Sequence, residues 1–252
     1  MPDSQQEMSA KFYPLPCLLT IASLFCGFYS ILAAVKGDFA VAATAILIAA
    51  VFDGLDGRVA RMTGTTSSFG KELDSLCDQV SFGVAPAVLA YYWALQPYGR
   101  YGWLAGFLYV ATTALRLARF NSQPPTASKD FVGLPCPAAA AVIAAGVLFS
   151  YRLGLEGTIR HTSIIVLVYA LSYLMVSSHR YLSFKQRQSG RGRTFPLIVG
   201  TLLLFVLIAA EHEIMLFVLF MLYSASGPAM GLLKRTRKTA AEASPPIHRT
   251  LE

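Results

Sequence analysis

Residues 53–61 read DGLDGRVAR and residues 70–78 read GKELDSLCD, and these two stretches decide how the rest of the chain is interpreted. They hold four aspartates, Asp53, Asp56, Asp74 and Asp78, in a chain with only fourteen acidic residues. The first two are three residues apart and the last two are four apart, so on helices each pair shares one face. Two antiparallel helices joined by a short turn would direct both pairs at one point.

The residue types around this point suit a metal-assisted reaction on phosphate. Four converging carboxylates cannot all stay ionised unless protons or cations lie beside them. Hard divalent cations prefer oxygen ligands, so Mg²⁺ or Mn²⁺ is the expected cofactor, and two ions would suit phosphoryl chemistry. Gly57, Ala60 and Gly70 leave the helix backbone accessible to a bulky ligand. The guanidinium of Arg61 suits phosphate oxygens.

The composition around these stretches is that of a membrane protein. Of the 252 residues, 55% are hydrophobic and only 14% are charged, against about 25% charged in an average soluble domain. At about 20 apolar residues per span, we predict an all-α polytopic membrane protein with about eight transmembrane helices. The expected spans are 16–35, 39–62, 72–95, 99–121, 134–152, 161–183, 195–210 and 213–233.

The basic residues orient these spans. With both termini in the cytoplasm, only four of the 21 Lys and Arg residues fall outside: Lys36, Arg100, Arg152 and Arg160. This bias follows the positive-inside rule. It predicts a multi-pass protein of the cell (inner) membrane, with the aspartates cytoplasmic and the net charge of +7 facing anionic membrane lipids. Nucleic acid is not an expected partner, because the basic residues are scattered over the loops of a hydrophobic chain.

The chain is expected to form a single transmembrane catalytic domain, residues 1–252. A short N-terminal segment, 1–15, and a C-terminal tail, 234–252, are predicted to be cytoplasmic. No internal repeat of fixed period divides the sequence.

The spacing D-x2-D-G-x2-A-R-x8-G-x3-D-x3-D resembles the signature of the CDP-alcohol phosphotransferase family. The chain matches all eight fixed positions, which are Asp53, Asp56, Gly57, Ala60, Arg61, Gly70, Asp74 and Asp78. The resemblance implies the fold of that family and its reaction, in which a phosphatidyl group passes from CDP-diacylglycerol to an alcohol and CMP leaves. By analogy with the family, a homodimer is also expected.

The resemblance also implies roles for individual residues. Asp53, Asp56 and Asp74 would hold the metal ions, and Asp78 would take the proton of the acceptor hydroxyl and also serve as a ligand. The remaining matched positions, Gly57, Ala60, Arg61 and Gly70, would border the CDP-lipid.

A further family pattern, Pro-Asn-x-x-Thr followed by another Asn, is only partly present. Residues 16–20 read PCLLT. Thr20 matches and is assigned to the CDP-lipid site, whereas Cys17 and Ser23 stand where the family usually has asparagine. An amide both donates and accepts hydrogen bonds and a thiol does little of either, so these replacements weaken the expected nucleotide contact.

Two other stretches indicate which alcohol accepts the phosphatidyl group. RLARFN at 116–121 and GLPCPAAA at 133–140 resemble the phosphatidylserine synthase branch of the family, which implies L-serine. Arg116 and Arg119 share a helix face and are predicted to bind a serine carboxylate or a lipid phosphate. Alternatively, they are only charged anchors at a span's end.

Two other functions stay open at this stage. The same chemistry with glycerol 3-phosphate, inositol phosphate or choline is one alternative. A divalent-cation channel or transporter is a more distant one, since intramembrane acids also mark ion paths.

Overall fold

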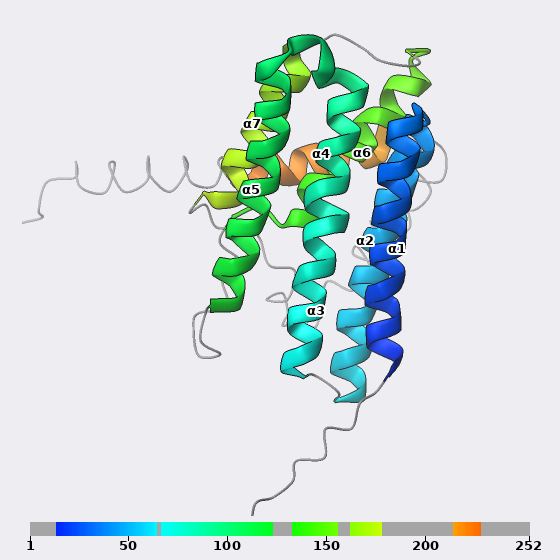
Figure 1. The fold of residues 1–252 in the computed structure, drawn as a ribbon, viewed down its shortest axis with the longest axis vertical. Helices are drawn as coiled ribbons and strands as arrows, with labels where there is room; N and C mark the ends of the chain where they lie inside the picture. The colour runs from blue at the N-terminus through cyan, green and yellow to red at the C-terminus, as the bar shows by residue number, and fades with distance from the viewer. Residues whose placement is uncertain (1–13, 65–66, 123–132, 156–161, 178–213, 228–252) are drawn as a thin grey trace, which may run out of the picture.

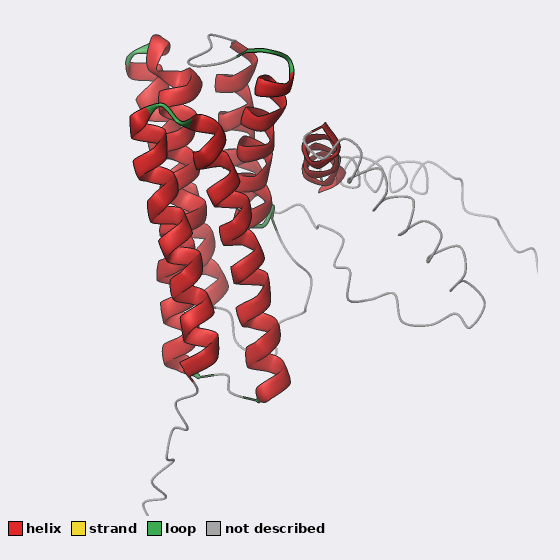
Figure 2. Ribbon diagram, turned by 90° about the vertical axis from the view of Figure 1, so that its right-hand side faces the viewer, coloured by secondary structure: helices red, strands yellow, loops and turns green. Residues whose placement is uncertain are grey.

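A computed structural model of the chain describes residues 14–64, 67–122, 133–155, 162–177 and 214–227, and the regular structure within them is helical (Figures 1 and 2). The main helices are α1 (Pro14–Lys36), α2 (Phe39–Thr63), α3 (Ser68–Asp78), α4 (Ala85–Ala90), α5 (Arg100–Ser122), α6 (Cys136–Arg152) and α7 (Thr162–Val176). A further helix spans Ile214–Gly227. The all-helical class predicted from the sequence is therefore confirmed.

The chain between α2 and α5 is one helical rod whose winding changes along its length. After α3 come the π-helix η1 (Gln79–Val84), α4, the π-helix η2 (Tyr91–Leu95) and the 3-10 turn η3 (Gln96–Tyr98). Gly99, with φ of +55°, then turns the chain into α5. The first π-helix begins directly after Asp78, a position where such a local insertion often accompanies a functional residue.

Helices α1 and α2 pack closely because small side chains line their contact. Ser23 Oγ donates to the Ala49 carbonyl at 3.1 Å, and Ser30 Oγ donates to the Ala42 carbonyl at 2.8 Å. Both alanines are fully buried. Small residues and interhelical hydrogen bonds of this kind hold helices together where lipid surrounds them. Ser23, one of the residues that replace the family's asparagine, is therefore used in packing.

Helix α1 also packs against α3 and η1. Gly27 of α1 makes this possible, because a Cβ there would lie 2.6 Å from Ser81 Oγ and 2.7 Å from the Ser81 backbone. The Ser81 hydroxyl donates to the Ser23 carbonyl at 3.1 Å. As a result, α1 holds α2 and the α3–η1 rod together.

Within the part of the chain that the structure describes, two helices are long and apolar enough to cross a membrane, Leu15–Lys36 and Phe39–Thr63. Three shorter apolar helices are Cys136–Arg152, Thr162–Val176 and Ile214–Gly227. The last of these lies across the long axis of the bundle in both views (Figures 1 and 2). The expected span 195–210, the segment before residue 14 and the tail 234–252 lie outside the described residues. Eight spans therefore stay a prediction.

The sixth expected span is described only in part, because residues 178–183 lie outside the described residues. It was predicted over 161–183, but α7 ends at Val176. The carbonyl of Leu174 accepts the Leu134 N–H at 3.0 Å, and the Met175 carbonyl accepts a hydrogen bond from Arg116. Groups from other segments thus satisfy carbonyls that a continuing helix would have used.

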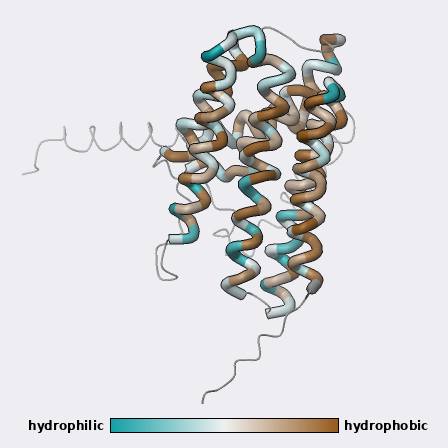
Figure 3. Tube along the Cα trace, in the orientation of Figure 1, coloured by the Kyte–Doolittle hydropathy of each residue, from teal (hydrophilic) through white to brown (hydrophobic). Residues whose placement is uncertain are grey.

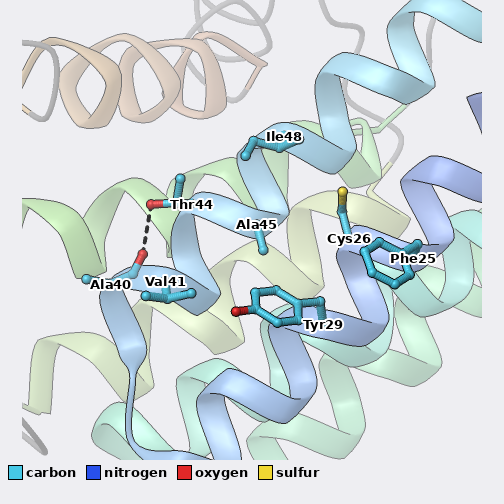
Figure 4. A pocket seen from close by; sticks show the side chains of 8 residues that line it. All are labelled: Phe25, Cys26, Tyr29, Ala40, Val41, Thr44, Ala45 and Ile48. Carbon is cyan, nitrogen blue, oxygen red and sulfur yellow. Dashed lines mark hydrogen bonds between the residues drawn. The ribbon is translucent and has the colours of Figure 1, made fainter.

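Hydrophilic residues of α2, α3 and α5 gather toward one end of the bundle, the lower end in Figure 3. The α2–α3 turn lies at the same end (Figure 1). Farther along α1 and α2 lies an apolar pocket that contains none of the four aspartates (Figure 4). It is lined by Phe25, Cys26, Tyr29, Ala40, Val41, Thr44, Ala45 and Ile48.

Candidate active site

The turn between α2 and α3 is shaped by two glycines. Gly64, with φ of +65°, ends α2 in the left-handed conformation, and its N–H donates to the Ala60 carbonyl. Ser67 caps the start of α3 by accepting the Gly70 N–H at 3.0 Å. A Cβ on Gly70 would lie 3.2 Å from that hydroxyl. Gly70, predicted to border the CDP-lipid, therefore also serves the cap that sets the start of α3.

Three of the four aspartates meet at one point. Asp53 and Asp56 on α2 and Asp74 on α3 each offer a carboxylate oxygen within 4.8 Å of the others. Asp56 is buried, with 6% of its surface exposed, and the other two are half-buried.

The arrangement fits a divalent cation. Oδ1 of Asp74 is buried and has no hydrogen-bond partner among the described residues. A buried carboxylate oxygen without a donor is costly, and a hard cation beside it would remove that cost. Three carboxylates also form the all-oxygen ligand set that Mg²⁺ and Mn²⁺ prefer.

Asp78 lies beside this group without being part of it. It is one helical turn after Asp74 on α3, and its carboxyl is hydrogen-bonded to that of Asp53. It is half-buried. The fourth aspartate therefore adjoins the cluster on the side where η1 begins, a suitable place for a group that receives a proton from a bound substrate.

Thr20 is the partner of Asp56. Its hydroxyl donates to Asp56 Oδ2 at 2.6 Å in a buried contact between α1 and α2. The same hydroxyl lies 3.1 Å from the Pro16 carbonyl, and the shorter contact to Asp56 Oδ2 is the one that orients the carboxylate. The sequence assigned Thr20 to the CDP-lipid, which stays a prediction, and the structure shows that its hydroxyl contacts the Asp56 carboxylate.

Replacing Thr20 with valine is expected to raise the Mn²⁺ concentration needed for half-maximal activity by about 10- to 100-fold, the usual cost of losing a partner of a metal ligand. Valine keeps the shape of threonine and removes the hydroxyl, with its contacts to Asp56 and to the Pro16 carbonyl. Metal titration of CMP release would measure the shift. Thr20→Ser keeps the hydroxyl and should stay close to wild type. An unchanged titration in Thr20→Val would rule out this role.

The other residues predicted on α2 follow the aspartates by one turn. Arg61 is exposed and bends back along the helix, since a Cβ on Gly57 would lie 3.5 Å from Arg61 Nη1. Ala60 is half-buried, one turn after Asp56. The positively charged Arg61 and the small residues Gly57 and Ala60 thus lie on α2 between the carboxylates and the α2–α3 turn.

The two arginines of α5 have different surroundings. Arg116 is half-buried, and its Nη1 donates to the Met175 carbonyl at 3.3 Å. Gly133, with φ of +82°, makes room for it, because a Cβ there would lie 2.8 Å from Arg116 Nη1 and 2.5 Å from the Met175 oxygen. Arg119, one turn later, is exposed. The assignment of both arginines to the acceptor carboxylate or to a lipid phosphate stays a prediction.

Asn121 was not among the predicted site residues, although it ends the quoted stretch RLARFN. Its Nδ2 donates to Ser75 Oγ at 2.9 Å and to Glu72 Oε2 at 3.4 Å. It therefore fastens the end of α5 to α3 next to Asp74. A polar residue at a helix end has many ordinary explanations, so spacing alone carries no signal for this contact.

The match to a known family decides between an enzyme and a channel. The sequence profile described as CDP-alcohol phosphatidyltransferase matches residues 13–171. This range includes the four aspartates and most of α7. The chain belongs to the CDP-alcohol phosphatidyltransferase family. The resemblance inferred from the aspartate spacing is thereby confirmed, and this CDP-alcohol phosphatidyltransferase is an enzyme of lipid metabolism rather than a channel.

Curated relatives of this CDP-alcohol phosphatidyltransferase come from bacteria and an archaeon. A CDP-diacylglycerol–serine O-phosphatidyltransferase from Helicobacter pylori is 42% identical over 176 residues, 69% of this chain and 74% of that protein. An archaetidylserine synthase from Methanothermobacter thermautotrophicus is 39% identical over 173 residues, 68% and 70% of the two chains. A CDP-diacylglycerol–serine O-phosphatidyltransferase from Bacillus subtilis is 34% identical over 185 residues, 70% of this chain and 97% of that protein.

Proposed function

We propose that this chain is a CDP-diacylglycerol–serine O-phosphatidyltransferase, which transfers the phosphatidyl group of CDP-diacylglycerol to the hydroxyl of L-serine and releases CMP. The main support for this proposal is that carboxylate oxygens of Asp53, Asp56 and Asp74 lie close together in a chain that is 42% identical over 176 residues to an enzyme of that name. The names of the three relatives differ in the lipid but share serine. Serine is therefore the acceptor we assign.

Asp53, Asp56 and Asp74 would hold Mg²⁺ or Mn²⁺, and we expect two ions with Asp78 as an additional ligand. Their support is the oxygen cluster and the unpaired Asp74 Oδ1. When bound, the metal neutralises negative charge on the pyrophosphate and on the phosphoryl group during transfer.

Asp78 is the group that we assign to the acceptor. The serine hydroxyl oxygen forms a bond to the phosphorus on the lipid side, and its proton passes to the Asp78 carboxylate. The bond from that phosphorus to the bridging pyrophosphate oxygen breaks, and CMP leaves with the electron pair. The support is the place of Asp78, which adjoins the three-oxygen cluster through Asp53.

Gly57, Ala60, Arg61 and Gly70 would border the CDP-lipid between the carboxylates and the α2–α3 turn. Arg61 would supply the positive charge for a phosphate oxygen, and the small residues would admit the nucleotide close to the backbone. Thr20 acts on this part of the site through Asp56. Arg116 and Arg119 remain assigned to the acceptor carboxylate or to a lipid phosphate, and the half-buried Arg116 is the better placed for the acceptor.

The protein would be a multi-pass, single-domain enzyme of the cell (inner) membrane, with the aspartates and both termini in the cytoplasm, and a homodimer. Its apolar helices and its family support a membrane location. The distribution of Lys and Arg supports the orientation.

An acceptor screen tests this function. Purified protein in detergent receives CDP-diacylglycerol and Mn²⁺ or Mg²⁺, and CMP release is followed with L-serine, glycerol 3-phosphate, inositol phosphate, choline or water. We expect metal-dependent release with L-serine. Release with another alcohol only would keep the chemistry and overturn serine, and no release together with cation flux in liposomes would overturn the enzyme.

A further inference from the structure

Two polar atoms where η1 packs against α5 are buried and have no hydrogen-bond partner among the described residues, Gln79 Oε1 and Tyr109 Oη. Tyr109 is fully buried in the core between helices. Protein interiors rarely leave such atoms unsatisfied, so each unpaired atom calls for a water or a ligand. The chemistry assigned above to the four aspartates uses neither atom.

The orientation of the Gln79 side chain is determined by its neighbour. Gln79 follows Asp78 directly, and its Nε2 donates to the Val110 carbonyl at 3.2 Å. A carbonyl only accepts hydrogen bonds, so the amide nitrogen must face Val110 and the amide oxygen is the unpaired atom. That oxygen can only accept, and it suits an N–H group of a ligand.

Tyr109 precedes Val110 on α5 and belongs to the buried core, which also includes Phe82 of η1 and Cys136 at the start of α6. Cys136, at the start of α6, is an electrostatic neighbour of both Tyr109 and Asp78. The Cys136 thiol is also hydrogen-bonded to Arg116. The start of α6, η1 and α5 therefore pack together around the Tyr109 side chain.

We propose that Gln79 and Tyr109 form the subsite for the charged groups of a zwitterionic amino-acid acceptor. The Gln79 oxygen accepts from the ammonium group, and the Tyr109 hydroxyl donates to the carboxylate. This inference rests on the proposed function and extends it from the metal cluster to the acceptor. Glycerol 3-phosphate and inositol phosphate have no ammonium group, and the ammonium of choline has no N–H. The two unpaired atoms together therefore favour serine.

The test matches each residue with an acceptor that lacks one charged group. Tyr109→Phe removes only the hydroxyl and should lower kcat/KM for L-serine by about tenfold or more, the usual range for a hydrogen bond to a charged group. It should have little effect on ethanolamine, which lacks the carboxylate, supplied as substrate or as competitor of serine. Gln79→Met should weaken L-serine similarly and spare 3-hydroxypropanoate, which lacks the ammonium.

Controls separate a lost contact from a damaged fold. The KM for CDP-diacylglycerol and the thermal midpoint should match wild type in both variants, and Tyr91→Phe, on the half-buried Tyr91 of η2, should leave serine kinetics unchanged. An equal effect of Tyr109→Phe on serine and ethanolamine, or none on either, would overturn the inference. The Gln79→Met arm decides alone if Tyr109→Phe does not fold. If wild-type protein released no CMP with L-serine, the proposed function itself would be refuted.

Discussion

Asp78→Asn should release CMP with L-serine about 10²- to 10⁴-fold more slowly than wild type, the range typical of a lost general base. Asparagine keeps the shape of aspartate and can still form a hydrogen bond to Asp53, but it cannot take up the serine proton. The KM for CDP-diacylglycerol should change by only a few-fold. Because Asp78 is also an expected ligand, the metal concentration for half-maximal activity should rise, but saturating Mn²⁺ should not restore the rate. Steady-state kinetics across a Mn²⁺ titration would measure all three quantities.

The matched control for this variant is Asp38→Asn. Asp38 is an exposed aspartate at the opposite end of α2, and it forms no side-chain hydrogen bond to cap that helix. It should keep wild-type kinetics. If activity of Asp78→Asn returned at high Mn²⁺, Asp78 would be only a metal ligand, and the proton would have to pass to another group.

Asp74→Asn is expected to lower activity by about a thousandfold or more. The loss of about 4 kcal/mol of charge stabilisation corresponds to that factor. The buried Oδ1 of Asp74 has no partner among the described residues, so its expected partner is the cation. The amide removes a negative charge and places a donor beside Asp53 and Asp56, which would bind that donor instead of a metal.

Thermal unfolding gives this prediction a readout besides activity. A ligand that binds only the folded state raises the unfolding temperature, so Mn²⁺ should stabilise wild-type protein and Asp78→Asn more than Asp74→Asn. Addition of a chelator should reverse the shift. An equal Mn²⁺ effect in wild type and Asp74→Asn would show that Asp74 does not hold the metal.

Much of the fold followed from the local pattern. The expected span 39–62 agrees with α2 almost to the residue, because an apolar run bounded by a polar residue and a left-handed glycine determines a helix locally. The end of α7 could not be predicted in this way. Its carbonyls are taken by Leu134 and Arg116, which are distant in sequence.

The switch from α-helix to π-helix after Asp78 is a second feature that pattern analysis missed. Apolar residues recur about every 3.6 residues on both sides of the switch. This period does not reveal that a π-helical turn contains one more residue than an α-helical turn. The switch accompanies a change of partners: Ser81 contacts α1, and Gln79 contacts α5.

The sequence by itself determined the helical class, the family and the two aspartate pairs, because residues three or four apart on a helix share a face wherever that helix packs. Only the tertiary structure decided that Thr20 donates to Asp56, that Arg116 donates to a carbonyl near the end of α7, and that Gln79 Oε1 and Tyr109 Oη are buried without partners among the described residues. These contacts join helices far apart in the chain. They depend on how closely small residues such as Gly27 and Gly133 let those helices approach, which no spacing within one helix records.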